Sequence, residues 1–269
     1  MSILGEDLIV LLLAFTFVSH HPGINALGLF LLQLSFWCIY EIGYIENDII
    51  GEKFEDQAVL SYNYNSSQYS FQLWQPWIWA FTLAIFGIML LHQEIALKGV
   101  YLGTIISGEY HQGLWKISEN LWYWGAFLLV LRYLFHIYNH LNKQSRVWFY
   151  FLLQACRYCG YLVLLTTNTI GLILLISKVL IRSIQYILYR YMGGENGDWP
   201  KDFPRYFFFL LIYLLILSAI ALNNRDISLI FNYQVLAIIS FCLIRGGKHF
   251  QKVFSQFVHV SQDSSNQIV

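Results

Sequence analysis

The sequence predicts an all-α polytopic membrane protein with about eight transmembrane helices in one bundle. Of its 269 residues, 57% are hydrophobic and 18% are aromatic. Only 12% are charged, against roughly 25% in ordinary soluble domains. The apolar residues gather in runs of about 20, the length that an α-helix needs to cross the hydrocarbon core of a bilayer. These observations together predict the class.

The first apolar run contains two acidic residues, Glu6 and Asp7. It lacks a basic segment ahead of its apolar core and a small-residue cleavage site, so we interpret it as a mature helix and not as a signal peptide. The segment 94–116 has an apolar part that is too short to span alone, so we expect it to be interfacial or re-entrant. The expected spans are 4–20, 24–45, 74–93, 117–138, 147–167, 169–189, 205–223 and 227–245.

These spans place the helical transmembrane domain at residues 1–250. The remaining residues, 251–269, form a polar C-terminal tail, and we expect the end of this tail to be disordered.

The basic residues predict how the spans are oriented. With this number of spans, the loops after spans 2, 4, 6 and 8 share one side of the membrane. Because cytoplasmic loops are enriched in Lys and Arg, we expect this side and both termini to be cytoplasmic, in a multi-pass protein of the inner (plasma) membrane. The opposite loops hold little beyond Lys98, Lys116 and Arg225. The loops on the expected cytoplasmic side hold Lys53, Lys143, Arg146, Arg190, Lys201, Arg205, Arg245, Lys248 and Lys252.

The formal net charge is zero. The chain therefore lacks the electrostatic footprint of a nucleic-acid-binding protein, and we expect no nucleic-acid partner.

Acidic residues crowd together at the end of the second expected span. On a continuous helix, Glu41, Asp48, Glu52 and Glu55 fall on one face, because their spacings return close to the same angle. Like charges stacked in this way repel unless a cation lies among them. A bound divalent cation, or a cation shared with a phosphorylated ligand, is therefore the functional interpretation. The alternative is a solvated acidic loop after a membrane span.

A second polar segment follows the fourth expected span. Helical spacing places its polar residues in one stripe, and their donors suit the oxygens of a diphosphate. The alternative is a helix end whose basic side chains extend toward lipid phosphates. The stripe consists of Arg132, His136, Asn139, Lys143 and Arg146.

A third polar segment, residues 191–205, follows the sixth expected span. Its glycines and prolines predict a loop, in which Asp198 and Asp202 have D-x-x-x-D spacing. Two aspartates four residues apart can hold a cation on a helix, but Pro200 between them argues against a regular helix. A plain hydrophilic turn is the alternative interpretation.

These segments resemble those of the UbiA-type membrane prenyltransferases. That family consists of helical bundles with an N-D-x-x-D-x-x-x-D motif after the second span and a D-x-x-x-D motif after the sixth. Asn47, Asp48 and Glu55 are in register with the first motif. Gly51 stands where the middle aspartate would be, and Glu52 is shifted by one position from it. Asp198 and Asp202 match the second motif.

The resemblance implies an intramembrane transferase that acts on a polyprenyl diphosphate or phosphate through Mg²⁺ on the cytoplasmic face. Prenyl transfer and phosphoribosyl transfer to a polyprenyl phosphate both remain open, and the partners implied are membrane lipid and an isoprenoid substrate. A non-catalytic membrane component or a transporter is the alternative, although polar groups on one face do not suit a transport path. The implied metal ligands are Asn47, Asp48, Glu52, Glu55, Asp198 and Asp202, and the implied diphosphate ligands are Arg132, Asn139, Lys143 and Arg146.

Charged residues inside spans cost about 2.5 to 3.5 kcal/mol on insertion scales and are functional candidates. Glu41, Arg157 and Lys178 are of this kind. We expect Glu41 to pair with Arg157 across the bundle. Lys178, with Arg182 on the same face, is expected to hold an anionic headgroup or to bond to a neighbouring helix.

Two weaker patterns complete the prediction. His136 and His140 are one helical turn apart, which suits a metal pair, but the sequence shows no third ligand nearby and so favours an interface role. Most of the aromatic residues are expected to face lipid or to form the interfacial belt, with Trp74, Trp77, Trp122 and Trp124 as examples.

Overall fold

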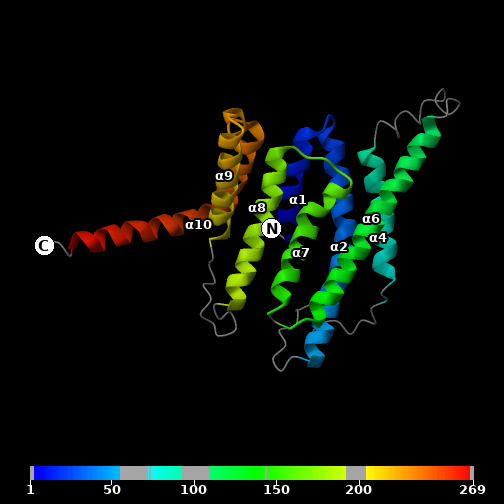
Figure 1. Cartoon of the computed structure of the whole chain (residues 1–269), viewed down its shortest axis with the longest axis horizontal. Coiled ribbons are helices and arrows are strands. Elements are labelled where there is room, and N and C mark those ends of the chain that lie inside the picture. The colour runs from blue at the N-terminus through cyan, green and yellow to red at the C-terminus, as the bar shows by residue number, and fades with distance from the viewer. Residues whose placement is uncertain are drawn as a thin grey trace. The chain divides into compact units, whose positions relative to one another are not determined.

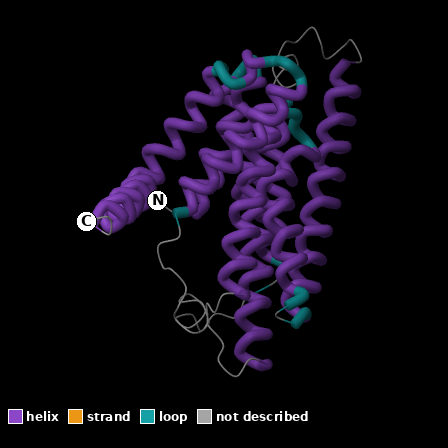
Figure 2. The backbone as a smooth tube through the Cα atoms, turned by 60° about the vertical axis from the view of Figure 1, so that its left-hand side comes forward, coloured by secondary structure: helices purple, strands orange, loops and turns teal. Residues whose placement is uncertain are grey.

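The computed structural model describes residues 3–54, 72, 74–92, 109–142, 144–191 and 204–266. Within these residues all regular secondary structure is helical and no strand occurs (Figure 2). The all-α prediction is thereby confirmed for the described part of the chain. Its α-helices are α1 (Ile3–Phe15), α2 (Pro22–Phe54), α4 (Gln75–Leu91), α6 (Glu109–His140), α7 (Arg146–Cys159), α8 (Thr169–Tyr191), α9 (Arg205–Asn223) and α10 (Tyr233–Asn266). Short 3-10 helices cover Thr16–Val18, Gly160–Val163 and Ile227–Leu229.

The chain divides into two compact units, Met1–Thr167 and Asn168–Val269. In the first unit α2 is the central helix, and α1, α4 and α6 all pack against it. Helix α7 in turn packs against α6, and Figure 1 shows α2, α4 and α6 running side by side. This arrangement brings the end of α2 next to the end of α6, where the candidate site lies.

Small and polar residues let α2, α4 and α6 approach closely. The Ser35 hydroxyl donates to the Ala80 carbonyl at 2.7 Å, and the Trp124 indole N–H donates to the Ser35 oxygen at 2.9 Å. A Cβ on Gly28 would lie 3.1 Å from the Gly87 carbonyl oxygen, so these two helices meet backbone to backbone. Trp124 is fully buried. Its assignment to an interfacial belt is therefore wrong, since its N–H takes part in the core.

A buried ion pair joins α1 to α7. The Arg157 guanidinium contacts the Asp7 carboxylate at 2.7 Å, and the Tyr158 hydroxyl donates to the other Asp7 oxygen at 2.9 Å. Arg157 also lies over the Trp37 ring, 4.9 Å from its centroid. The expected pairing of Arg157 with Glu41 is therefore wrong, because the Glu41 side chain is exposed and Asp7 is the ion-pair partner.

The second unit consists of α8, α9 and α10. Helix α9 packs against both α8 and α10, and the later part of α10 extends away from α9 (Figure 1). Lys178 of α8 is fully buried, with its ammonium 4.9 Å from the centre of the Phe209 ring. Helix α10 passes through residue 250, the expected end of the transmembrane domain, and remains helical to Asn266.

Among the described residues, three helices are long and apolar enough to cross a membrane: α2, α8 and α9. Helix α4 is apolar but has only 17 residues. Helix α1 has 13 residues and so extends over about 20 Å, which is less than the hydrocarbon thickness of about 30 Å. The three long apolar helices support an all-α membrane protein.

Several expected segments differ from the structure in their bounds. The span predicted at 227–245 begins as a 3-10 helix, and α10 starts at Tyr233. The span predicted at 4–20 is α1 followed by a 3-10 helix that ends at Val18. The span predicted at 147–167 is α7 followed by a 3-10 helix that ends at Val163. The segment 94–116 lies partly outside the described residues, and its last part, from Glu109, forms the beginning of α6.

Candidate polar site at the ends of α2 and α6

Helix α2 continues without a break to Phe54, so most of the predicted acidic cluster lies on one helix. Within it, Asp48 is buried and Asn47 is half-buried, whereas Glu41 and Glu52 are exposed. Glu55 lies outside the described residues. The prediction of an acidic face requires a continuous helix, and α2 is helical as far as Phe54.

The centre of the site is Glu46, which the sequence prediction did not include among the ligands. One terminal nitrogen of Arg132 contacts a Glu46 carboxylate oxygen at 2.6 Å. The Asn139 amide donates to the same oxygen at 3.0 Å, and His136 Nδ1 lies 2.9 Å from the other oxygen. Both carboxylate oxygens are thus contacted by side chains of α6.

The local sequence explains why α2 and α6 meet at this point. The ring of Phe135 occupies the space where a Cβ of Gly43 would lie, so a glycine is needed for this approach. The Asn139 amide also donates to the Gly43 carbonyl at 3.0 Å. Glu46 lies one turn further along α2, and the spacing of Arg132, His136 and Asn139 places all three on the face of α6 that meets it.

Arg146 contacts the backbone at the end of α6. Its guanidinium donates to the Leu141 carbonyl at 2.9 Å and to the Asn139 carbonyl at 3.2 Å. These carbonyls end α6, where no further turn of helix supplies backbone donors. Arg146 therefore caps α6 with part of its donor set, and it is buried.

The structure brings together some of the predicted ligands and leaves others outside its description. Arg132 and Asn139 lie beside the acidic end of α2, as the prediction of a shared site requires. Lys143, Asp198 and Asp202 lie outside the described residues. Helical spacing places Glu46 one turn beyond Gly43, but only knowledge that α2 packs against α6 there would have selected it.

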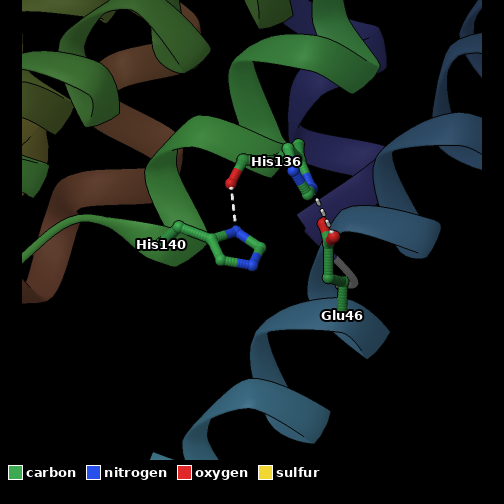
Figure 3. A group of neighbouring side chains, drawn as sticks. All are labelled: Glu46, His136 and His140. Carbon is green, nitrogen blue, oxygen red and sulfur yellow. Dashed lines mark hydrogen bonds and ion pairs between the residues drawn. The ribbon is translucent and has the colours of Figure 1, made fainter.

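Two histidines of α6 share this site with Glu46 (Figure 3). His136 and His140 come from successive turns, and their ring centres are 4.3 Å apart. His140 Nδ1 lies 2.7 Å from the His136 carbonyl oxygen. One potential ligand atom from each of Glu46, His136 and His140 lies within 4.8 Å of the others.

Aromatic rings lie next to the polar network along α2. The centres of the Tyr40 and Phe135 rings are 4.6 Å apart, and those of the Tyr44 and Phe135 rings are 6.0 Å apart. Tyr40 also contacts Phe36 one turn earlier, with a centroid distance of 5.1 Å. An aromatic column of packed rings therefore lies next to the polar site within the first unit.

A pocket lies at the other end of α2. It has a volume of about 230 Å³, and its lining includes Asn25, Leu29, His92 and Asn120. The Asn120 amide and the His92 ring contact each other in this wall. Asn25 and Glu46 are separated by about 30 Å along the helix, so this pocket is distinct from the polar site.

No protein-family model, curated protein or solved structure shows a significant match to the chain. The described residues themselves define a class: an all-helical protein with three helices able to cross a membrane and a polar network that joins α2 to α6.

Proposed function

We propose that the protein is an intramembrane transferase that acts on a polyprenyl diphosphate or a polyprenyl phosphate through a Mg²⁺-bridged site. The observation that carries the proposal is the meeting of the acidic end of α2 with the polar stripe of α6. Arg132 and Asn139 both contact Glu46, the residue directly before Asn47 and Asp48. We propose that these donors and the carboxylate and amide oxygens at the end of α2 serve one phosphorylated ligand.

The donor chemistry of α2 fits magnesium. Asn47, Asp48 and Glu52 supply amide and carboxylate oxygens, the ligand type that Mg²⁺ prefers. Asp48 and Glu52 are one helical turn apart, and Asp48 is buried, which limits competition from bulk water. In the proposal Glu55, Asp198 and Asp202 complete the metal ligands. When bound, Mg²⁺ would neutralise charge on the diphosphate leaving group.

Arg132 and Asn139 would contact the phosphorylated substrate. The Arg132 guanidinium has several N–H groups, and its contact with Glu46 uses one terminal nitrogen. The remaining donors point to a role in binding phosphate oxygens, with Glu46 holding the side chain in place. Lys143 would add a further positive charge, and Arg146 would act mainly by fixing the end of α6.

The aromatic column suits the hydrophobic part of such a substrate. Departure of a diphosphate from an allylic carbon leaves positive charge on the prenyl chain, and each ring face stabilises a nearby cation by roughly 0.5 to 2 kcal/mol. Tyr40, Tyr44 and Phe135 are the rings closest to the polar network. They are the described residues best placed to protect that charge from water.

The proposal includes the topology predicted from the sequence. Eight helices would cross the inner (plasma) membrane, with the site on its cytoplasmic face. Transfer of a phosphoribosyl group to a polyprenyl phosphate would use the same metal and phosphate ligands. The proposal therefore includes this reaction.

Binding of a polyprenyl diphosphate to the purified full-length protein tests this function. We expect binding to require Mg²⁺ and to weaken at least tenfold in Asp48→Asn. Glu41→Gln is the matched control, because Glu41 lies on the same helix but is exposed and is not among the proposed metal ligands. Asp48→Asn and Arg132→Gln should be non-additive if they serve one site. Mg²⁺ dependence that is unchanged in Asp48→Asn would contradict the proposal, and absence of binding by the natural chain would favour a transporter or a non-catalytic component.

A further inference from the structure

We propose that Glu46, His136 and His140 form a second metal site, selective for a transition metal ion of the Zn²⁺ type. This site is separate from the proposed Mg²⁺ ligands Asn47, Asp48 and Glu52, and it does not depend on the transferase proposal. It arises because α2 supplies the third ligand that the two histidines of α6 lack in the sequence (Figure 3).

The distances suit metal binding after small side-chain rotations. The potential ligand atoms all lie within 4.8 Å of one another. Ligands that are each about 2 Å from a tetrahedral zinc ion lie about 3.3 Å apart. Because His136 and His140 are exposed and come from successive turns of one helix, their rings can close this difference without a backbone shift.

The hydrogen bond of His140 sets the correct tautomer for a ligand. Its Nδ1 lies 2.7 Å from the His136 carbonyl oxygen, which can only accept a hydrogen bond. Nδ1 must therefore carry the proton, which leaves a lone pair on Nε2. Metal-binding histidines commonly donate their other ring N–H to a backbone carbonyl in this manner, because the bond fixes the ring and increases its basicity.

The contacts of Glu46 leave one of its oxygens directed at the histidines. Arg132 and Asn139 both contact Oε2, whereas Oε1 lies 2.9 Å from His136 Nδ1. A metal ion would replace the hydrogen bond between Oε1 and His136, and the neutral His136 ring would then carry its proton on Nε2. The positive charge of Arg132 opposes a bound cation and so limits its affinity, but Arg132 also holds the carboxylate in place.

The ligand set determines which metal is bound. Two imidazoles and one carboxylate suit Zn²⁺, Ni²⁺, Co²⁺ and Cu²⁺, whereas Mg²⁺ prefers oxygen ligands alone. Three protein ligands leave a fourth tetrahedral position for water or for an anionic oxygen. The side chain of His136 is 55% exposed, so a metal ion could reach this ligand from solvent.

Metal binding to the purified full-length protein, with a purification tag that contains no histidine, tests the proposal. Zn²⁺ affinity is measured by competition with a chromophoric chelator, and Co²⁺ absorption reports the coordination. We expect one Zn²⁺ per chain and no competition from excess Mg²⁺. His136→Gln and His140→Gln should each weaken binding at least tenfold, and Glu46→Gln should also weaken it. The double variant His20→Gln and His21→Gln is the matched control, because this exposed pair lies outside the site.

Arg132→Gln separates metal binding from general damage to the fold. Removal of its positive charge should raise Zn²⁺ affinity severalfold, whereas a damaged site would bind more weakly. Failure of the natural chain to bind micromolar Zn²⁺, or binding that is unchanged in His140→Gln, would overturn the proposal. Binding that is lost in the histidine variants but unchanged in Glu46→Gln would also overturn it, because the site would then be a histidine pair on one helix. None of these results depends on a prenyl diphosphate, so each is independent of the transferase test.

Discussion

At the residue scale, the ion pair between Asp7 and Arg157 shows how the first unit accommodates charge in its apolar core. The two side chains are 2% and 5% exposed. Arg157 is surrounded by the rings of Trp37, Tyr40 and Tyr158, with its charge directed at their faces. The carboxylate of α1 and the guanidinium of α7 therefore depend on each other, since both are buried.

Loss of the Asp7 carboxylate should be strongly destabilising. We expect Asp7→Ala to lower the free energy of unfolding by about 3 to 5 kcal/mol, because a buried charge without its partner remains. Glu41→Gln, at the exposed position that the sequence prediction paired with Arg157, should change it by less than about 0.5 kcal/mol. Denaturant unfolding of both variants in detergent measures the difference. Equal losses in the two variants would show that Glu41 shares the role of Asp7.

Residue partners were the least predictable part of the candidate site. The sequence identified Arg132 and Asn139 as polar residues that face a ligand site, and the structure places them beside α2. Glu46 was missed because helical spacing from Glu41 and Asp48 selected a different face of α2. Charge pairs depend on which helices are neighbours, and a single sequence does not contain that information.

At the element scale, the contact between α2 and α6 depends on Gly43. The Phe135 ring fills the position of the missing side chain, and the neighbouring Asn139 amide bonds to the Gly43 carbonyl. This contact is one turn from Glu46. The position of the polar network therefore follows directly from how closely the two helices pack.

A methyl group at this contact should separate the helices. We expect Gly43→Ala to destabilise the protein by about 1 to 3 kcal/mol, the usual effect of overpacking a filled core. Gly23→Ala is the matched control, because a Cβ there would have no atom within 4 Å. Thermal unfolding in detergent measures stability, and Zn²⁺ affinity reports whether Glu46 has moved from the histidines. Equal stability of the two variants would mean that α6 can shift away from Gly43 without loss.

The helices themselves were more predictable than their ends. Apolar runs indicated each of the helices that the structure describes, but the run at 147–167 continues past the helix end at Cys159. The difference arises from the residues that follow. The Thr167 hydroxyl contacts the Ala14 carbonyl, and the Asn168 side chain accepts a bond from the Gly171 N–H at 2.8 Å to begin α8. A local cap thus starts α8 in the short polar stretch at 166–169.

At the scale of the whole molecule, hydrophobicity indicates how many helices are available but not how they associate. The division into two compact units, near Thr167, follows contacts that a linear pattern does not contain. Hydrophobicity also does not fix the number of membrane crossings. Only three described helices meet the length and composition of a full span, so the crossings by the shorter helices need a direct measurement.

Accessibility of single cysteines in right-side-out vesicles provides that measurement, after Cys38, Cys156, Cys159 and Cys242 have been replaced. The chosen positions are exposed and lie between helices: His20 after α1, Gln144 after α6 and Asn224 after α9. With eight crossings and cytoplasmic termini, a membrane-impermeant reagent should label His20→Cys and Asn224→Cys but not Gln144→Cys.

The labelling pattern also identifies the error if the count of crossings is wrong. An additional span through residues 94–116 would reverse every later loop, so Gln144→Cys would become labelled and Asn224→Cys protected, while His20→Cys would stay labelled. Reversal of all three sites would instead mean that the orientation is wrong and the count is right. The Gln144 result bears most directly on function, because this residue follows the end of α6 that carries Arg132, His136 and His140. A protected Gln144→Cys would place the polar network on the cytoplasmic side, where phosphorylated precursors and Mg²⁺ are available to it.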